Sequence, residues 1–274
     1  MLYFDNVGFS YGTGEGGIST VSGISFRLEK GEFAALIGEN GAGKSTLARL
    51  CNGLLKPDSG RVTVAGLDTR HVKTSLIARK LGFLFQNPDR QICCNTVREE
   101  ILFGLNAIMG GNEEGAAQIR EERLNEALEL FGLPGGGDPF SMSRGERQQI
   151  ALASVLAVKP ELLILDEPTT GLDYRECVNI MGIISRLHRE GTTILMISHD
   201  MELVADYAER GLVLSGGKLI GDLSVKELMK NRPLLEAASL LPAQIPALAM
   251  ALGEGFENVY TVDEMTEAVY ERLA

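Results

Sequence analysis

The sequence has no tryptophan, and among its 274 residues there are only four cysteines and three histidines. The cysteines are Cys51, Cys93, Cys94 and Cys177. They form no C-x-x-C pair and have no histidine-rich segment beside them, so the spacing indicates neither a zinc site nor a disulfide framework. We expect reduced thiols in a reducing compartment.

Long apolar runs and excess positive charge are also missing. No run approaches the roughly 20 residues that span a bilayer, and the first residues lack the features of a signal peptide. The 26 Lys and Arg are outnumbered by 37 Asp and Glu, which gives a net charge of −11. This balance does not suit a surface that neutralises phosphate backbones, so we predict no nucleic-acid partner. Work at a membrane would require recruitment by another protein.

Short apolar runs alternate with helical patterns, which predicts an α/β fold with a largely parallel, buried sheet. The strongest runs are residues 33–37, 162–165 and 193–197, which are apolar on both faces of the expected strand. Weaker strand candidates are residues 61–64, 81–85, 211–214 and 218–220.

The helical patterns divide the chain into parts. Residues 88–158 are expected to form a helical subdomain inserted into a domain of residues 1–222. Within the insert, residues 120–131 have apolar side chains at helical spacing. Residues 223–274 are expected to be a small helical appendage, to which the family resemblance described below gives a role in dimerisation. In that appendage, Thr261 and Glu264 fit a capping box that begins a helix.

A glycine-rich segment follows the first strong strand and matches the phosphate-binding pattern G-x-x-x-x-G-K-[ST]. Glycines permit a tight loop whose N–H groups surround phosphates, Lys44 would contact the β- and γ-phosphates, and Ser45 would bind Mg²⁺. The predicted ATP-binding residues of this loop are Gly38, Glu39, Asn40, Gly41, Ala42, Gly43, Lys44, Ser45 and Thr46.

Two carboxylates follow the strand at residues 162–165, where α/β sheets place their ligands. Asp166 is the expected partner of Mg²⁺, either directly or through its ligands. Glu167 can polarise the attacking water as a general base. Two solvated acids after a strand are common, but downstream of a phosphate loop they favour nucleotide hydrolysis.

Further segments resemble those of ABC ATPases, and their order covers roughly residues 3–220. Gln86 is similar to the Q-loop glutamine, which also contacts the metal, and His199 to the switch histidine. Tyr11 is placed like the aromatic residue that stacks on adenine, and Asp173 like the D-loop aspartate. The signature resembles residues 141–148, with Ser143, Arg144, Gly145 and Glu146 at its centre.

The resemblance implies a fold of the P-loop NTPase type, with ATP and Mg²⁺ as cofactors and catalysis by Glu167, His199 and Gln86. Two ATP molecules would lie between two subunits, with the signature of one subunit facing the P-loop of the other. The family's usual Leu-Ser-Gly-Gly-Gln is here Met142 to Glu146, so Arg144 replaces a glycine and leaves the backbone less free to approach phosphate.

Residues 85–92 and 96–104 are similar to the ATPases of energy-coupling factor (ECF) importers for vitamins or transition-metal ions. This resemblance implies a transmembrane coupling subunit, a substrate-binding membrane subunit and a peripheral position on the cytoplasmic face of the membrane. Asp89 to Ile92 would face the coupling subunit. The ATPase of another ABC importer and a soluble ABC protein are alternatives, and both homodimer and heterodimer remain open.

Overall fold

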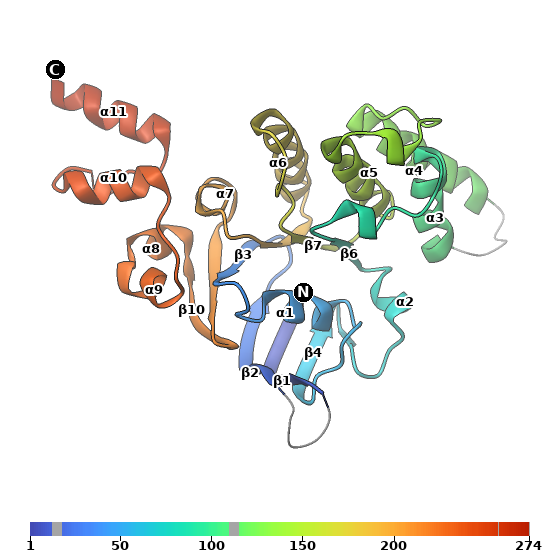
Figure 1. The fold of residues 1–274 in the computed structure, drawn as a ribbon, viewed down its shortest axis with the longest axis horizontal. Coiled ribbons are helices and arrows are strands. Elements are labelled where there is room, and N and C mark those ends of the chain that lie inside the picture. Colours follow the sequence, from blue (N-terminus) through green and yellow to red (C-terminus); the bar gives the residue numbers. More distant parts are fainter. Residues whose placement is uncertain (13–17, 110–114, 257, 274) are drawn as a thin grey trace.

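A six-stranded sheet forms the centre of the fold in the computed structural model, which describes residues 1–12, 18–109, 115–256 and 258–273 (Figure 1). Neighbouring strands are parallel except for the antiparallel pair at one edge. All the strands of this sheet were predicted, although the last one is longer than expected. Their order is β10 (Lys218–Ser224), β9 (Arg210–Ser215), β3 (Phe33–Gly38), β8 (Thr193–Ile197), β7 (Leu162–Asp166) and β6 (Leu81–Leu84).

Strand β3 shows why the central runs are apolar on both faces. Ala35 and Ile37 belong to a hydrophobic core on one side of the sheet, whereas Ala34 and Leu36 belong to a second core on the other side. All four residues are fully buried. A strand covered on both faces carries no polar alternation, so it appears in the sequence as a continuous apolar run.

A second, antiparallel sheet was largely missed by the sequence analysis, which predicted only part of one strand. Successive register shifts interrupt the pairing along β1. These irregularities break the two-residue alternation by which a half-exposed strand is recognised. The strand order is β2 (Ile18–Leu28), β1 (Leu2–Tyr11), β4 (Ser59–Val64) and β5 (Leu67–Asp68), and helices α1 (Lys44–Cys51) and α2 (Thr74–Ile77) accompany it.

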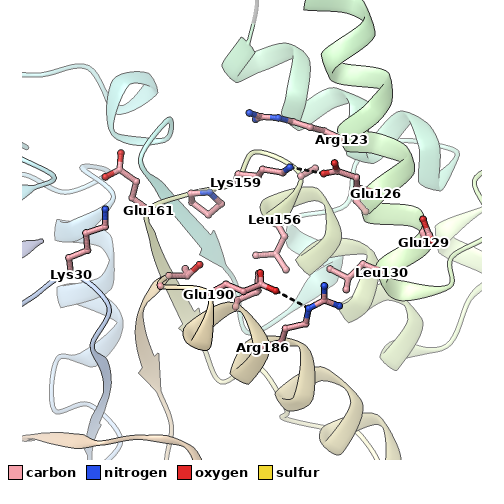
Figure 2. Close-up of a pocket in the computed structure, with 16 residues that line it drawn as sticks. Lys30, Arg123, Glu126, Glu129, Leu130, Leu156, Lys159, Glu161, Arg186 and Glu190 are labelled. Carbon is pink, nitrogen blue, oxygen red and sulfur yellow. Dashed lines mark hydrogen bonds and ion pairs between the residues drawn. The ribbon is translucent and has the colours of Figure 1, made fainter.

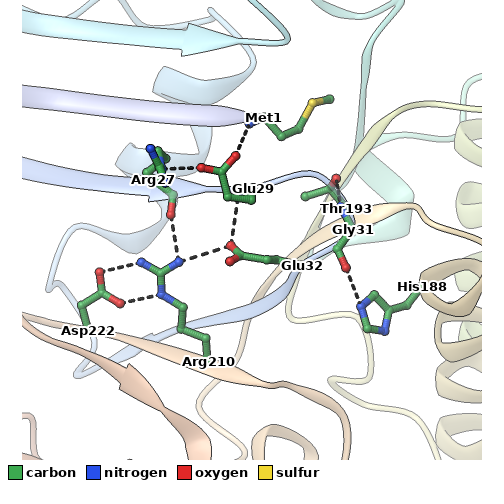
Figure 3. Close-up of polar contacts among 9 residues, drawn as sticks. All are labelled: Met1, Arg27, Glu29, Gly31, Glu32, His188, Thr193, Arg210 and Asp222. Atoms are coloured by element: carbon green, nitrogen blue, oxygen red, sulfur yellow. Dashed lines mark hydrogen bonds and ion pairs between the residues drawn. The ribbon is translucent and has the colours of Figure 1, made fainter.

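Arg210 connects the two sheets through polar contacts (Figure 3). From β9, its guanidinium donates to Asp222 on β10 at 2.6 and 2.8 Å. It also donates to the carbonyl of Arg27 on β2 at 2.9 Å and to the Glu32 carboxylate at 3.2 Å. The planar group thereby joins the edge of the antiparallel sheet to the edge of the central sheet.

Helices cover the face of the central sheet that is turned away from the antiparallel sheet. Residues 88–158 contain the expected helices, and α4 starts earlier than the predicted residue 120. In Figure 1 these helices lie at the opposite end of the molecule from the last two helices of the chain. No helix in the described segments is long and apolar enough to cross a bilayer. The helices on this face are α3 (Val97–Met109), α4 (Ala116–Phe131), α5 (Arg144–Leu156), α6 (Tyr174–Arg189) and α7 (Met201–Tyr207).

The carboxyl-terminal appendage divides differently from the expected boundary at residue 223. Helices α8 (Val225–Lys230) and α9 (Arg232–Ala237) contribute to the same core as the central sheet. Only α10 (Gln244–Leu252) and α11 (Val262–Leu273) build a separate small cluster. The boundary at 223 was placed where composition changes, but apolar packing continues past it.

The predicted capping box at the start of α11 is confirmed. The backbone N–H of Glu264 donates to the Thr261 hydroxyl at 3.2 Å, and the N–H of Thr261 donates to the Glu264 carboxylate at 3.0 Å. These bonds satisfy two donors that the first turn of a helix leaves unpaired.

The packing predicts different outcomes for two truncations. A chain ending at Ala243 should keep the melting temperature of its main transition, because it loses only the small cluster of α10 and α11. A chain ending at Asp222 loses Leu228, Met229 and Leu235, which are at most 1% exposed. Each such loss costs about 2–5 kcal/mol, so the total approaches the ~5–15 kcal/mol that stabilises a domain. Circular dichroism melts would measure both, and equal stability of the two chains would contradict this division.

Candidate functional site

The carboxyl ends of four neighbouring parallel strands meet at one edge of the central sheet. Leu84 of β6 pairs with Leu165 of β7, Asp166 pairs with Ile197 of β8, and Ile197 also pairs with Leu36 of β3. The residues that follow these strands therefore emerge side by side, where open α/β sheets bind ligands. They are Gln86, Asp166 and Glu167, His199, and the glycine-rich loop of residues 38–45.

The glycine-rich loop needs its glycines for backbone conformation and for space. Gly41 and Gly43 have φ angles of 86° and 104°. Residues with a side chain rarely adopt such positive angles. A Cβ on Gly43 would also lie 2.9 Å from the carbonyl oxygen of Thr20. The loop leads into α1, whose first turn offers backbone N–H groups and the positive end of a helix dipole to an anion.

Lys44 is folded into this loop. Its ammonium donates to the carbonyls of Gly38 at 2.6 Å and Glu39 at 2.9 Å. Burial lowers the pKa of Lys44, although the Glu167, Asp166 and Glu39 carboxylates oppose that shift. A cation is therefore held next to the loop where the sequence predicts the β- and γ-phosphates.

Glu167 is the point at which three segments of the chain meet, those of Gln86, of Glu167 with Thr170, and of His199. Its Oε2 accepts hydrogen bonds from Gln86 Nε2 at 2.7 Å and from the Thr170 hydroxyl at 2.9 Å. Its Oε1 lies 3.0 Å from His199 Nδ1. Because an ionised carboxylate only accepts hydrogen bonds, Nδ1 is the donor in this contact.

The backbone and the charge of Glu167 are both unusual. Its φ of 49° is left-handed, a strained conformation for a residue with a side chain. The peptide is held there by a bond from Glu167 N–H to the carbonyl of Ile197 at 2.9 Å. Burial raises the pKa of Glu167, but bonds from Thr170, His199 and Gln86 and the charge of His199 outweigh it, and the net shift is downward. The carboxylate is thus kept ionised and oriented.

Asp166 has the opposite electrostatic environment. Burial, reinforced by the negative charge of Glu167, raises the pKa of Asp166 to about 6, while Arg49 and Lys44 oppose the shift. A bound divalent cation would stabilise the ionised form of the buried Asp166 carboxylate. The oxygens of Asp166, Ser45 and Gln86 are of the type that Mg²⁺ prefers, so the residues fit that ion.

Tyr11 reaches the glycine-rich loop from the antiparallel sheet. Its hydroxyl lies 3.4 Å from the Thr46 hydroxyl on α1, and its ring packs edge-on against Phe9 with centroids 4.9 Å apart. The tyrosine is 41% exposed, so one part of the ring remains open to a ligand. This position suits the predicted contact with adenine.

The predicted signature lies at the exposed start of α5. Ser143 is the N-cap, its hydroxyl accepts from the N–H of Glu146 at 3.2 Å, and Glu146 accepts from the N–H of Ser143 at 2.7 Å. These backbone and hydroxyl bonds from Ser143 lower the pKa of Glu146. Arg144 is the first helical residue, a position that requires no glycine conformation. Residue 144 therefore needs no glycine to begin the helix.

The next glycine of the signature has no room for a side chain. A Cβ on Gly145 would lie 1.9 Å from Oε1 of Glu176 on α6. Glu176 also accepts from the N–H of Asp173 at 3.0 Å, so it joins the signature to the predicted D-loop. On the other side, Arg144 covers Gly171, where a Cβ would lie 2.9 Å from its Nε.

Three further residues of this site were not singled out from the sequence. They are Thr170, which binds Glu167; Gln148, whose Nε2 donates to the carbonyl of Pro168 at 3.2 Å; and Glu176. Glu176 stands three residues after Asp173, and this capping-box spacing is the signal that could have identified it. Gln148 lies within the predicted signature segment, but its contact with Pro168 is made across the fold. The bond from Thr170 to Glu167 is local and spans three residues.

A large cavity of about 940 Å³ lies elsewhere, beside the amino-terminal ends of β7 and β8 (Figure 2). Lys159 and Glu126 on its rim pair at 2.7 Å, and Arg186 and Glu190 pair at 3.0 Å. None of the predicted site residues lines this cavity. The predicted site therefore does not coincide with this cavity.

The contact between Gly145 and Glu176 predicts a non-additive pair of substitutions. Gly145→Ala should destabilise the protein by about 1 kcal/mol, the typical value of a helix cap, because Glu176 must leave Asp173. In a Glu176→Ala background, the same alanine should be neutral or stabilising, as alanine normally is in a helix.

Urea denaturation of the single and double variants measures this coupling. Gly182→Ala on α6 is the matched control, since a Cβ there meets no atom within 4 Å. It should stabilise the protein in both backgrounds. Additive effects of Gly145→Ala and Glu176→Ala would show that the two residues are not coupled.

Comparison with known proteins places the site in a family. The profile of the family described as ABC transporter matches residues 21–170. An ABC transporter ATP-binding protein of Caldanaerobacter subterraneus, TTE1589, is 44% identical over 245 residues, which are 89% of this chain. The energy-coupling factor transporter ATP-binding protein EcfA of Methanothermobacter thermautotrophicus is 40% identical over 94% of this chain and 82% of its own length.

Solved structures agree with the fold. CbiO1 of Clostridium perfringens, part of the ABC transporter complex CbiONQ, matches with a TM-score of 0.75, 28% identity and coverage of 92% of this chain and 98% of its own. The ATP-binding cassette MJ0796, a dimer bound to ADP and Pi, matches with a TM-score of 0.74 and 27% identity over 82% of this chain and 99% of its own.

The length of the relatives is a separate observation. This chain spans 42% of TTE1589 and 42% of a Methanosarcina mazei relative of 41% identity. The family match nevertheless covers more than half of the chain and includes both the P-loop and the acidic pair. The predicted P-loop fold of the ABC ATPase type is confirmed, and the chain belongs to the ABC transporter family.

Proposed function

We propose that this protein hydrolyses ATP with Mg²⁺ in a dimer and thereby energises an ECF-type membrane importer of vitamins or transition-metal ions. The observation that carries the chemistry is the convergence of Gln86, Thr170 and His199 on one carboxylate, Glu167. This arrangement holds an ionised base beside the P-loop, where in-line attack on a γ-phosphate requires an oriented water.

Each residue of the edge has a distinct part in that chemistry. Lys44 and the loop N–H groups bind and neutralise the phosphates. Glu167 orients and deprotonates the attacking water, while His199 and Gln86 fix the carboxylate. Mg²⁺ would be held by Ser45 and Asp166 with Gln86 beside it, and would supply charge neutralisation for the phosphates.

The signature indicates a second subunit. In the part of the chain that the structure describes, no hydrogen bond or ion pair joins Ser143, Arg144 or Glu146 to the P-loop. All three are exposed at the positive end of α5. This helix end can bind an anion but makes no such contact with the P-loop of its own subunit. It therefore suits a γ-phosphate that is bound by another subunit. The dimeric state of MJ0796 supports this arrangement, and a homodimer or a heterodimer would satisfy it equally.

The segment after Gln86 supports an integral membrane partner. Gln91 and Asp89 are tied to the helical subdomain: Gln91 donates to the carbonyl of Ala151 at 3.0 Å, and Asp89 pairs with Arg147 at 2.7 Å. Ile92 is buried, so of the four residues expected to face a coupling subunit it is the one that cannot. Asp89 and Arg90 remain exposed. A partner that contacts them would move Gln86 and the helical subdomain together.

The likeness to EcfA and to CbiO1 favours the ECF branch over other importers. We therefore propose a transmembrane coupling subunit and a substrate-binding membrane subunit as partners, and a peripheral position on the cytoplasmic face. The helical insert at 88–158 would transmit the motion, and the appendage would support dimerisation.

The partner proposal is tested by purifying the tagged protein from native membranes in mild detergent and identifying what accompanies it by mass spectrometry. We expect integral membrane proteins, with or without a second ABC ATPase. Arg90→Glu should reduce their recovery severalfold, because charge reversal at an interface is costly.

Arg189→Glu is the matched control, since Arg189 is an equally exposed arginine at the far end of α6. It should leave recovery unchanged. Purification with no membrane protein, or with ribosomes or DNA, would contradict the transport proposal and leave the ATPase site standing.

A further inference from the structure

Two adjacent cysteines lie in the segment that joins the Q-loop to α3. Cys93 follows Gln86 by seven residues and is exposed, and Cys94 is partly exposed. Their Sγ atoms are 4.0 Å apart. Glu100, on the first turns of α3, offers a third ligand, and one donor atom from each of the three residues lies within 4.8 Å of the others.

Glu100 fixes this geometry from within the protein. The side chain is buried, with a relative exposure of 3%. Its Oε2 accepts the backbone N–H of Cys93 at 2.8 Å and that of Cys94 at 2.9 Å. The carboxylate therefore holds the backbone of the pair directly, and it also lies within hydrogen-bond reach of the Cys94 thiol.

The sulfur separation matches a metal site more closely than a disulfide. Tetrahedral zinc with Zn–S distances of about 2.3 Å places two sulfurs about 3.8 Å apart. A disulfide would require a separation of about 2.05 Å.

The charges also favour a cation. Two thiols and a carboxylate are crowded together, and among the described residues no Lys, Arg or His forms an ion pair with Glu100. A thiophilic divalent cation would replace the thiol protons and neutralise the cluster.

We propose that Cys93, Cys94 and Glu100 form a binding site for a thiophilic divalent cation of the zinc class. The two sulfurs and one carboxylate oxygen are the protein ligands, and the fourth tetrahedral position is open to water. The sequence spacing predicted ordinary thiols, because it does not show that Glu100, the third ligand, lies beside the two cysteines. The bound ion would fix the segment after the Q-loop to α3, and its binding is independent of ATP hydrolysis.

The test is a Co²⁺ titration of the full chain, carrying a tag without histidine, in a phosphine reductant and without nucleotide. We expect one equivalent of Co²⁺ to give a near-ultraviolet thiolate band with the visible bands of tetrahedral cobalt, and Zn²⁺ to displace it. The Cys93→Ser/Cys94→Ser variant should lose these bands. Glu100→Gln should weaken binding by roughly tenfold or more.

Cys177→Ser is the matched control and should retain the bands, since this partly exposed thiol lies on α6. Unchanged melting of the double serine variant would show that the loss is not one of folding, because its backbone N–H groups still bind Glu100. A spectrum of octahedral, oxygen-bound cobalt alone would overturn the proposal. So would Co²⁺ binding of equal affinity in the double serine variant.

Discussion

The bonds around Glu167 are the constraint on which the functional edge of this fold depends. Its peptide is held in a left-handed conformation by the carbonyl of Ile197, at the end of the neighbouring strand. That conformation directs the carboxylate toward Thr170 of the same segment and toward Gln86 and His199, which come from two other segments. The parallel register of β6, β7 and β8 brings those segments into reach. Burial of both faces of the sheet keeps the register fixed, because a shift of one residue would exchange its two hydrophobic cores.

A second constraint links the signature to the D-loop. Glu176 occupies the space beside Gly145 and also caps the turn that begins at Asp173. The Glu176 side chain therefore positions both the signature and the D-loop, which would contact the same nucleotide, bound by the partner subunit. Arg144 covers Gly171 from the other direction. The unusual arginine in the signature is thus part of a local packing arrangement and causes no distortion of the helix end.

Much of the central sheet could be predicted from the sequence, because strands buried on both faces leave continuous apolar runs. The P-loop was equally clear, since Gly41, Gly43 and Lys44 have spacing set by phosphate geometry. The antiparallel sheet was largely missed because its irregular register destroys the alternation of side chains. The contact of Gln148 with Pro168 and the position of Glu100 beside Cys93 could not be predicted, since each depends on how the chain packs. The appendage boundary was placed too early because composition does not show which core a helix joins.

In the proposed function, Glu167 is the base of an ATP site that a second subunit completes. Its most direct test is the mass of Glu167→Gln, measured by light scattering with ATP and Mg²⁺. We expect a stable ATP-bound dimer with negligible hydrolysis. Its mass should be roughly twice the 29.6 kDa of the chain if both subunits are copies of it. Glu161→Gln, at the other end of the same strand region, should hydrolyse ATP normally, and adding Lys44→Ala should abolish the trapped dimer. Full hydrolysis by Glu167→Gln, or a monomer that retains ATP, would contradict the account.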